Sequence, residues 1–410
     1  MTRFFRPRQL VPVLSVATLP LLFAACSGNY PNSTFQHTTE FNRDLTSLWN
    51  QMMWWGLAVF VIVETLLVYV IVRFRRRPDS PEPRHVHGNA LMEISWTVAP
   101  ALILAIIAVP TVRSIWKYQT PAPNGSLQIE VIGHQWWWEF KYPEHGITTA
   151  NEIYLPVGRT VNFTLRSADV IHSFWIPGLG GKRDAVSNQV NHLWYTPDSV
   201  GVTGWIGSCN EYCGASHANM RFRVFTVAPA DFDSWANHQK AKAVYPPPAP
   251  DTVAVRQVAA APAPAPAAIA EGYVFPAAQR PAHVVPATPI PAGNTFTEGL
   301  TGDPQRGLAI YSRSACIGCH KIDGNPMSIG IIGPNLTHIA SRATIAGGLF
   351  PNDTRHMQLW IKNARKMKPG VTMNSLGKGE FDPILKMTVT VGGLTDQEIA
   401  DIAAYLQMLK

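Results

Sequence analysis

The sequence predicts a multidomain membrane protein in which a pair of transmembrane helices precedes an all-β domain and a small all-α domain. Three observations support this prediction: two long apolar stretches separated by a basic loop, a run of short strand-like segments, and a compact C-terminal segment with helical periodicity. A chain of 410 residues has room for two or three domains. The net charge is +7, but the sequence contains no basic run interleaved with aromatic residues. This argues against a nucleic-acid partner.

Residues 1–26 are typical of a secretory signal peptide. Three arginines precede an apolar stretch from Leu10 to Phe23, and two alanines stand directly before Cys26. We expect a signal of the lipoprotein type, whose cleavage would leave Cys26 as a lipidated N-terminus. The alternative is an ordinary cysteine beside an apolar signal.

Residues 27–120 are expected to form a transmembrane two-helix hairpin. Its apolar stretches run from Trp54 to Val72 and from Ile94 to Val112, close to the roughly 20 residues that span a bilayer. The loop between them carries five arginines at positions 73, 75, 76, 77 and 84. The positive-inside rule places this loop in the cytoplasm, so everything after Trp116 is expected on the opposite, periplasmic face of the membrane.

Three further segments follow the hairpin. In residues 121–232, short strand-like stretches such as Leu127–Ile132 alternate with Gly, Pro and Asn turns, as in a β-sandwich or barrel. Residues 233–296 are expected to be a Pro/Ala-rich linker, because this composition favours an extended chain and cannot bury a core. Residues 297–410 return to a helical pattern and end in an amphipathic helix, Thr395–Met408, with Thr395 and Glu398 placed as a capping box.

A metal-binding pattern lies between positions 209 and 220. Cys209 and Cys213 are spaced so that two thiolates from one loop can bridge two soft metal ions. His217 would complete the coordination of one metal and Met220 would add a weak axial thioether, a combination that selects copper in electron-transfer sites. His172 is the best candidate for the histidine of the second metal. A disulfide or a zinc site built from the same residues is the alternative.

A second cofactor signature lies at Cys316-Ile317-Gly318-Cys319-His320, the attachment motif of c-type haem. Cys316 and Cys319 would bond to the haem vinyl groups, and His320 would be the proximal iron ligand. The distal ligand should follow, and a thioether there suits electron transfer because it raises the reduction potential. Met373 is the first candidate, and the others are Met387, Met367, His338 and His356.

The loop at 209–220, His172 and the run Gly133–Trp138 resemble the binuclear CuA domain of cytochrome c oxidase subunit II, and the two-helix hairpin also matches that family. The resemblance extends over essentially the whole chain and implies a cupredoxin fold for residues 121–232. It implies copper ligation by His172, Cys209, Cys213, His217, Met220 and the backbone carbonyl of Glu211. It also implies that the Glu211 side chain binds magnesium at the contact with subunit I.

The same resemblance implies roles for two further residues. Trp136 aligns with the aromatic residue through which the family receives electrons, and simple packing is the alternative for this ring. Glu93, just before the second apolar stretch, resembles the glutamate at the mouth of a proton channel shared with subunit I. A solvated carboxylate at headgroup level is the alternative for Glu93.

A cytochrome fused to this subunit resembles the caa-type oxidases, which implies a class I cytochrome c domain at residues 297–410. Lys368–Met373 resembles its distal loop, and the Pro334 carbonyl would hold the tautomer of His320. The implied path runs from an external cytochrome c or an upstream respiratory complex to haem c, then to CuA, and then to haem a of subunit I. The expected setting is a proton-pumping oxidase, with subunits I and III, in a bacterial inner membrane.

Two other functions are compatible with parts of this pattern. The chain could be a stand-alone, membrane-tethered electron carrier or copper carrier, although a lipid anchor would then suffice without the hairpin. It could also be a quinol oxidase subunit, which uses the same fold without copper. The complete set of copper-type ligands argues against the second of these.

Overall fold

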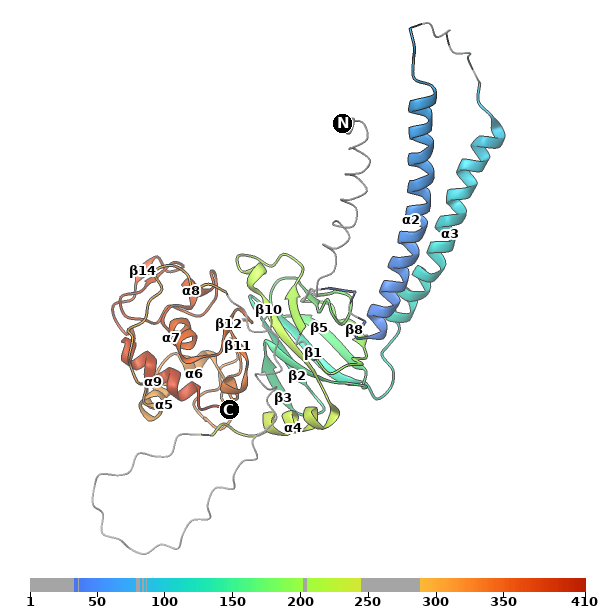
Figure 1. Ribbon diagram of the computed structural model, residues 1–410. Coiled ribbons are helices and arrows are strands. Elements are labelled where there is room, and N and C mark those ends of the chain that lie inside the picture. Colours follow the sequence, from blue (N-terminus) through green and yellow to red (C-terminus); the bar gives the residue numbers. More distant parts are fainter. Residues whose placement is uncertain are drawn as a thin grey trace, which may run out of the picture.

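A computed structural model describes residues 33–35, 37–78, 82, 85, 87–201, 205–244 and 288–410. The expected signal peptide with Cys26, Arg84 of the basic loop and most of the Pro/Ala-rich linker lie outside these described residues. Along the chain the described residues form a helix hairpin, a two-sheet β domain and a helical domain (Figure 1). The predicted order of a transmembrane hairpin, an all-β domain and an all-α domain is therefore confirmed.

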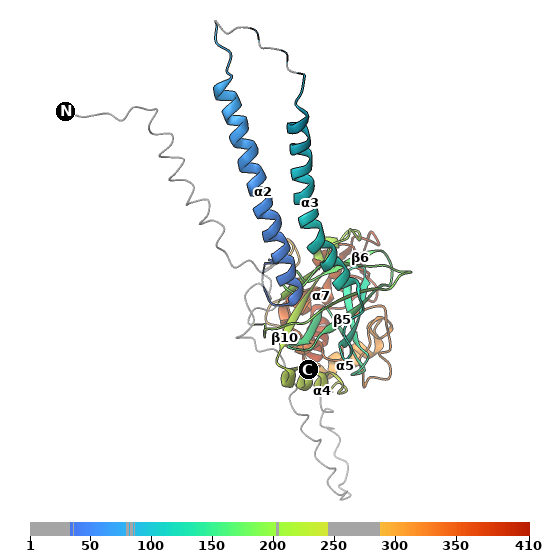
Figure 2. The same ribbon diagram turned by 90° about the vertical axis from the view of Figure 1, so that its right-hand side faces the viewer.

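The hairpin consists of α2 (Glu40–Arg73) and α3 (Ala90–Gln119), which run side by side away from the β domain (Figures 1 and 2). Thr39 caps α2 and Asn89 caps α3 by accepting hydrogen bonds from backbone N–H groups of the first turn. Both helices extend beyond the apolar stretches predicted from the sequence. Each is long and apolar enough to cross a membrane, and the apolar part of each is exposed in the isolated chain.

The N-terminal end of α2 is attached to the β domain by side-chain hydrogen bonds to three consecutive carbonyls at positions 177–179. The hydroxyls of Thr38 and Thr39 donate to the carbonyls of residues 178 and 179 at 2.6 and 2.5 Å. The Asn42 amide donates to the carbonyl of residue 177 at 3.1 Å. Thr39 and Asn42 are fully buried in this contact, so the start of α2 packs directly against the β domain.

The β domain contains two five-stranded sheets. The first has the order β3-β2-β1-β5-β8. Its strands are β1 (Leu127–His134), β2 (Trp137–Tyr142), β3 (Ile147–Ala150), β5 (Val161–Ser167) and β8 (Asn191–Tyr195). The second has the order β4-β10-β9-β6-β7. Its strands are β4 (Glu152–Pro156), β6 (His172–Trp175), β7 (Arg183–Ala185), β9 (Trp205–Cys209) and β10 (Arg221–Val227).

The sheets are mixed and enclose an aromatic core. β1 pairs with β5 and β4 with β10 in parallel, while the other neighbouring strands are antiparallel. Burial alternates along β1, so one face of the first sheet points into the core. There the rings of Phe174 and Phe222 stack with centroids 5.0 Å apart, and Trp138 meets both edge-on. This core lies directly beneath the end of β9, where Cys209 stands.

A helix that the sequence analysis did not predict closes the β domain. α4 (Pro229–Gln239) begins with a proline at its first turn and packs along the bottom of the sandwich. Trp235 stacks on Tyr154 with ring centroids 4.7 Å apart, and Phe232 is buried beside it. The helix crosses the expected boundary between residues 232 and 233.

The helical domain is built from short elements around a small core. Its helices are α5 (Pro304–Arg313), α6 (Cys316–Cys319), α7 (Thr354–Lys362), α8 (Ala364–Met367) and α9 (Asp396–Leu406). The 3₁₀ turn Ile339–Ser341 and two small hairpins complete it. These hairpins pair β11 (Thr344–Ile345) with β12 (Phe350–Pro351) and β13 (Phe381–Asp382) with β14 (Met387–Thr388).

The first and last helices of this domain, α5 and α9, pack so closely that their backbones are in contact. A methyl group built at Gly307 would lie 2.0 Å from the carbonyl oxygen of Asp401, so only glycine permits the contact. Beside it, the buried Asp401 carboxylate receives two hydrogen bonds from Arg306, at 2.9 and 3.0 Å. At the start of α9 the predicted capping box of Thr395 and Glu398 is confirmed.

Candidate copper and haem sites

The sulfur-containing loop is positioned by the neighbouring strands β6 and β9. Cys209 is the last residue of β9, and Phe174 of β6 is its partner in the register. His172, the first residue of β6, is thereby brought beside Cys209 although 37 residues separate them. The backbone N–H of Cys209 donates to the carbonyl of Met220 at 3.0 Å and closes the loop.

The predicted copper ligands converge in this loop. The sulfur atoms of Cys209 and Cys213 are 3.7 Å apart. Nδ1 of His172 lies 3.8 Å from the Cys209 sulfur, and Nδ1 of His217 lies 3.6 Å from the Cys213 sulfur. The Met220 sulfur is 3.8 Å from that of Cys213, and the Glu211 carbonyl oxygen is 3.2 Å from that of Cys209. Each thiol therefore has one imidazole and one weaker donor beside it.

The orientation of His172 is set by its neighbours. Asp169 Oδ1 lies 2.7 Å from Nε2, which leaves Nδ1 directed at Cys209. Gly133 makes room for the ring, since a methyl group built there would lie 2.6 Å from Cδ2 of His172. Burial lowers the pKa of His172, but the hydrogen bonds to Asp169 and Cys209 outweigh this effect, and the net shift is upward.

The two thiols share one hydrogen bond, which affects the pKa of each. The sulfur–sulfur hydrogen bond with Cys213 lowers the pKa of Cys209 in spite of burial, and the same bond together with burial raises the pKa of Cys213. Both side chains are buried within a cluster of soft sulfur and nitrogen donors. This donor set fits a thiolate-bridged copper pair, because copper accepts thiolate, imidazole and thioether together.

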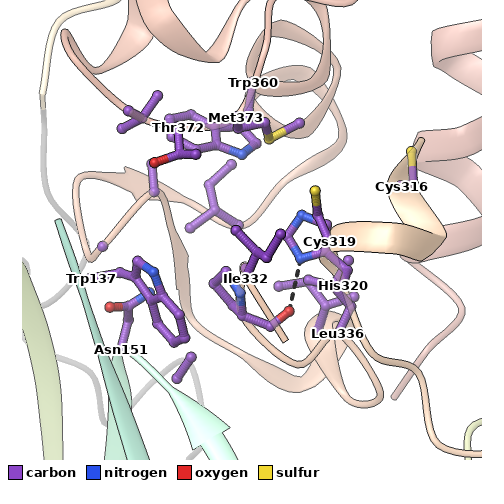
Figure 3. Close-up of a pocket in the computed structure, with 18 of the residues that line it drawn as sticks. Trp137, Asn151, Cys316, Cys319, His320, Ile332, Leu336, Trp360, Thr372 and Met373 are labelled. Atoms are coloured by element: carbon purple, nitrogen blue, oxygen red, sulfur yellow. Dashed lines mark hydrogen bonds between the residues drawn. The ribbon is translucent and has the colours of Figure 1, made fainter. Parts of the chain in front are cut away.

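The haem-attachment residues lie around a cavity of about 450 Å³, a size within the range of cofactor pockets. Cys316 and Cys319 stand at the two ends of α6, and His320 follows directly (Figure 3). The Pro334 carbonyl is 2.8 Å from His320 Nδ1, as predicted, so this nitrogen donates and Nε2 remains available to a metal. The apolar lining and this oriented imidazole fit a covalently attached haem.

Among the candidate distal ligands, Met373 lines this cavity across from His320 (Figure 3). Met387 is exposed on β14, and Met367 is buried in the domain core outside the cavity lining. His338 has both ring nitrogens close to carbonyl oxygens, at 2.8 and 3.0 Å. His356 is held 2.8 Å from the Asp353 carboxylate.

A buried ion pair that no sequence pattern indicates shapes the Met373 loop. Arg365 lies 2.7 Å from both carboxylate oxygens of Asp382, and both side chains are buried. The same guanidinium donates to the carbonyls of Val371 and Thr372 at 3.2 Å each. These hydrogen bonds set the backbone directly before Met373. Arginine and aspartate 17 residues apart carry no local signal that could have revealed the pair.

Trp136 lies between the two sites. Its indole N–H donates to the Cys213 carbonyl at 2.9 Å, and the ring is only 9% exposed. The neighbouring tryptophans differ, because Trp137 stacks on His134 at 4.1 Å while Trp138 belongs to the core. Lys368 of the helical domain donates to the Trp136 carbonyl at 2.5 Å, and burial lowers the pKa of this lysine to about 7.

Two predicted carboxylate side chains lie outside the donor clusters described above. Glu93 is in the first turn of α3, at the end of the hairpin remote from the β domain (Figure 1). The Glu211 side chain is exposed beside the copper loop, and only its carbonyl faces Cys209. Neither carboxylate contacts the cavity that His320 lines.

The fold and the two sites define a membrane-anchored redox protein with a copper-type cluster and a c-type haem site in consecutive domains. Residues 31–113 match the model of the cytochrome c oxidase subunit II transmembrane domain, residues 144–227 that of its periplasmic domain, and residues 304–410 that of cytochrome c. The chain belongs to the cytochrome c oxidase subunit II family. It is a component of a terminal oxidase, membrane-anchored with a periplasmic domain, and its domains imply CuA copper, haem and a role in electron transfer.

Curated relatives cover most of the chain. Cytochrome c oxidase subunit 2 of Bacillus subtilis is 28% identical over 97% of this chain and 97% of its own length. The subunit of the same name from Bacillus sp. strain PS3 is 31% identical over 82% of this chain and 80% of its own length. The crystal structure of the periplasmic domain of cytochrome oxidase subunit II from Bradyrhizobium japonicum is 29% identical over 29% of this chain and 97% of its own, with a TM-score of 0.28.

Proposed function

We propose that this chain is the electron-accepting subunit of a proton-pumping cytochrome c oxidase. Electrons from a cytochrome c or an upstream respiratory complex reach haem c, pass to CuA, and leave for haem a of subunit I, where oxygen is reduced to water. The observation that carries the proposal is the pair of thiols 3.7 Å apart, each with its own imidazole, in the same chain as a haem-attachment motif.

We assign the copper pair to His172, Cys209, Cys213, His217, Met220 and the carbonyl of Glu211. When bound, such a pair shares one electron between two metals, so that little reorganisation accompanies its reduction. The protein contributes rigidity: Asp169 orients His172, and burial of the Cys209 and Cys213 side chains excludes water from both sulfur atoms. The sandwich beneath the loop keeps these donors in place in both oxidation states.

We assign the haem to Cys316, Cys319, His320 and Met373. The Pro334 carbonyl keeps the proton on Nδ1 of His320, which favours ligation through Nε2. Arg365 and Asp382 hold the loop that carries Met373. A thioether ligand raises the potential of the iron, which suits an electron donor to copper.

The remaining expectations from the sequence are part of this proposal. Trp136 is the aromatic residue through which electrons reach the copper loop, consistent with its hydrogen bond to the Cys213 carbonyl. Glu211 binds magnesium at the contact with subunit I, and Glu93 stands at the mouth of a proton channel shared with that subunit. Subunit III completes the complex in a bacterial inner membrane, with both cofactor domains on the periplasmic face.

We also propose the domain limits on which this account is based. They are a signal peptide at 1–26, the hairpin at 27–120, the CuA domain at 121–232, the linker at 233–296 and the cytochrome c domain at 297–410. Because α4 packs on the CuA domain as far as Gln239, the packed chain continues past the limit at 232. The tether would keep the haem domain at a high local concentration beside the copper domain.

The test is purification of the whole complex from membranes, followed by anaerobic reduction with cytochrome c. We expect the chain to co-purify with subunit I, and the haem c and copper absorptions to respond to reduction and then to oxygen. A complex that oxidises quinol and has no copper in this subunit would instead indicate a quinol oxidase. Extraction of the chain without subunit I would favour a stand-alone carrier.

A further inference from the structure

Trp136 is held from two sides by loops that belong to different domains. On the copper side, its indole N–H bonds to the Cys213 carbonyl at 2.9 Å, and a methyl group built at Gly214 would lie 3.0 Å from the ring. On the haem side, a methyl group built at Gly370 would lie 2.9 Å from the ring, so the backbone of that loop rests against the indole. The ring therefore has little open surface.

Lys368 fastens the haem-side loop to Trp136. Its ammonium donates to the Trp136 carbonyl at 2.5 Å and to the Ala346 carbonyl at 3.1 Å, and the side chain is 2% exposed. Burying an ammonium group is costly unless hydrogen bonds replace its water, and here two backbone carbonyls accept from it. Lys368 begins the loop that runs through Gly370 to Met373. Its hydrogen bond to Trp136 therefore holds the same loop that carries the proposed haem ligand.

Buried polar side chains also make further hydrogen bonds between the two domains. Glu152 of the β domain is 2% exposed and accepts from the N–H and hydroxyl of Thr344 at 2.8 and 3.0 Å. Arg223 is 1% exposed and donates to the Gly348 carbonyl at 2.5 Å. Each bond would have to be exchanged for water if the domains separated, which favours one defined docked arrangement over a range of encounters.

We propose that Lys368 is a positioning residue that locks the Met373 loop against Trp136, so that Trp136 is an internal bridge between haem c and CuA and is closed to outside donors. This inference rests on the proposed function. The step moves one electron: the haem iron is oxidised by one unit, the copper pair is reduced by one, and no bond or proton changes. An external donor then delivers its electrons to the haem domain and never to Trp136.

The test uses the intact oxidase with Lys368→Met, which keeps the length of the side chain and removes its donor. Haem c is photoreduced with a flash, and the copper absorption is followed in time. We expect the transfer rate to fall by about tenfold or more, because small misplacements of reacting partners have effects of this size. The spectra and midpoint potentials of both centres should stay as in the parent protein, which separates positioning from damage to either site.

Lys366→Met is the matched control, since Lys366 lies in the same segment but donates to the Gly293 carbonyl and not to the β domain. It should transfer electrons at the parent rate. Glu152→Gln loosens a second contact between the domains, at Thr344, which also lines the haem cavity, and it should slow transfer by less than Lys368→Met does while the haem spectrum stays unchanged. If Lys368→Met fails to take up haem, the electron-transfer rate of Glu152→Gln becomes the test of the inference.

An unchanged rate in Lys368→Met, with both centres intact, would overturn the inference. If Lys368→Met does not take up haem, an unchanged electron-transfer rate in Glu152→Gln would overturn the inference instead. Neither result would affect the proposed function, which fails only if the parent complex lacks the copper centre or the haem.

Discussion

The sulfur atoms of Cys209 and Cys213 face each other at 3.7 Å, and each has a different imidazole nitrogen beside it. His172 reaches Cys209 from β6, while His217 follows Cys213 in the same loop. His172 and His217 would therefore give two metals held by this loop one imidazole each. Similar surroundings are what an electron shared between two metals requires.

Cys209→Ser removes one of the two bridging sulfurs. We expect the near-infrared copper absorption to be lost while the haem spectrum is retained, because a hydroxyl is a poor ligand for soft copper and the haem domain has its own core. Absorption spectra of the purified complex test this, with the haem as the internal control. Survival of the copper absorption would show that Cys209 is not a ligand.

Gly133→Ala tests how His172 is placed without changing a ligand. The new methyl group would lie 2.6 Å from Cδ2 of the buried His172 ring, so the ring must shift from its present position beside Cys209. Overpacking of this kind costs about 1–3 kcal/mol of stability. We expect an altered copper spectrum, weaker copper retention against a chelator, and an unchanged haem. A copper spectrum identical to that of the parent would contradict this placement of His172.

Met373→Ala should convert haem c to a high-spin or otherwise altered form with a lower reduction potential, because the thioether across the cavity from His320 is removed. Met387→Ala is the matched control, since that side chain is exposed on β14 and should leave the spectrum unchanged. Spectra and redox titrations of both variants provide the measurement. The reverse pattern would assign the distal position to Met387.

The Asp401–Arg306 pair predicts an acid dependence of the haem domain. Burial raises the pKa of Asp401, but hydrogen bonds from Arg306 and the Asp303 N–H outweigh it, so the folded-state pKa lies below the ordinary value. The pair therefore contributes stability above about pH 4, where an unfolded aspartate is ionised, and loses it as the pH falls further.

Asp401→Asn should accordingly lower the thermal stability of the haem domain at neutral pH. The difference from the parent should shrink as the pH falls below about 4, because protonation then removes the same charge from the parent. Thermal unfolding followed through the haem absorption at several pH values measures this. A difference that persists undiminished in acid would exclude the charge as its cause.

Sequence predicted the features that depend on local spacing. Each of these features lies within one short, continuous segment of the sequence: the apolar stretches, the Cys209–Met220 loop, the haem motif and the Thr395 cap. His172 lies outside these local patterns: the need for a second histidine made it the best candidate, the family resemblance agreed, and only the pairing of β6 with β9 explains its position.

Contacts between distant segments could not be predicted. Lys368 meets the Trp136 carbonyl across 232 residues, and Thr344 meets Glu152 across 192. A lysine or a glutamate in a sequence is ordinarily a solvated surface residue, and burial appears only once both domains are folded together. The helix α4 was missed for a similar reason, because its Trp235 is explained only by the Tyr154 ring that it covers.

The most direct test of the central claim is electron paramagnetic resonance of the oxidised, purified complex. The account predicts a signal from one unpaired electron shared equally by two copper nuclei, present in the parent protein and absent in Cys209→Ser. A signal from a single copper ion, or metal analysis that finds only zinc bound by this loop, would contradict it.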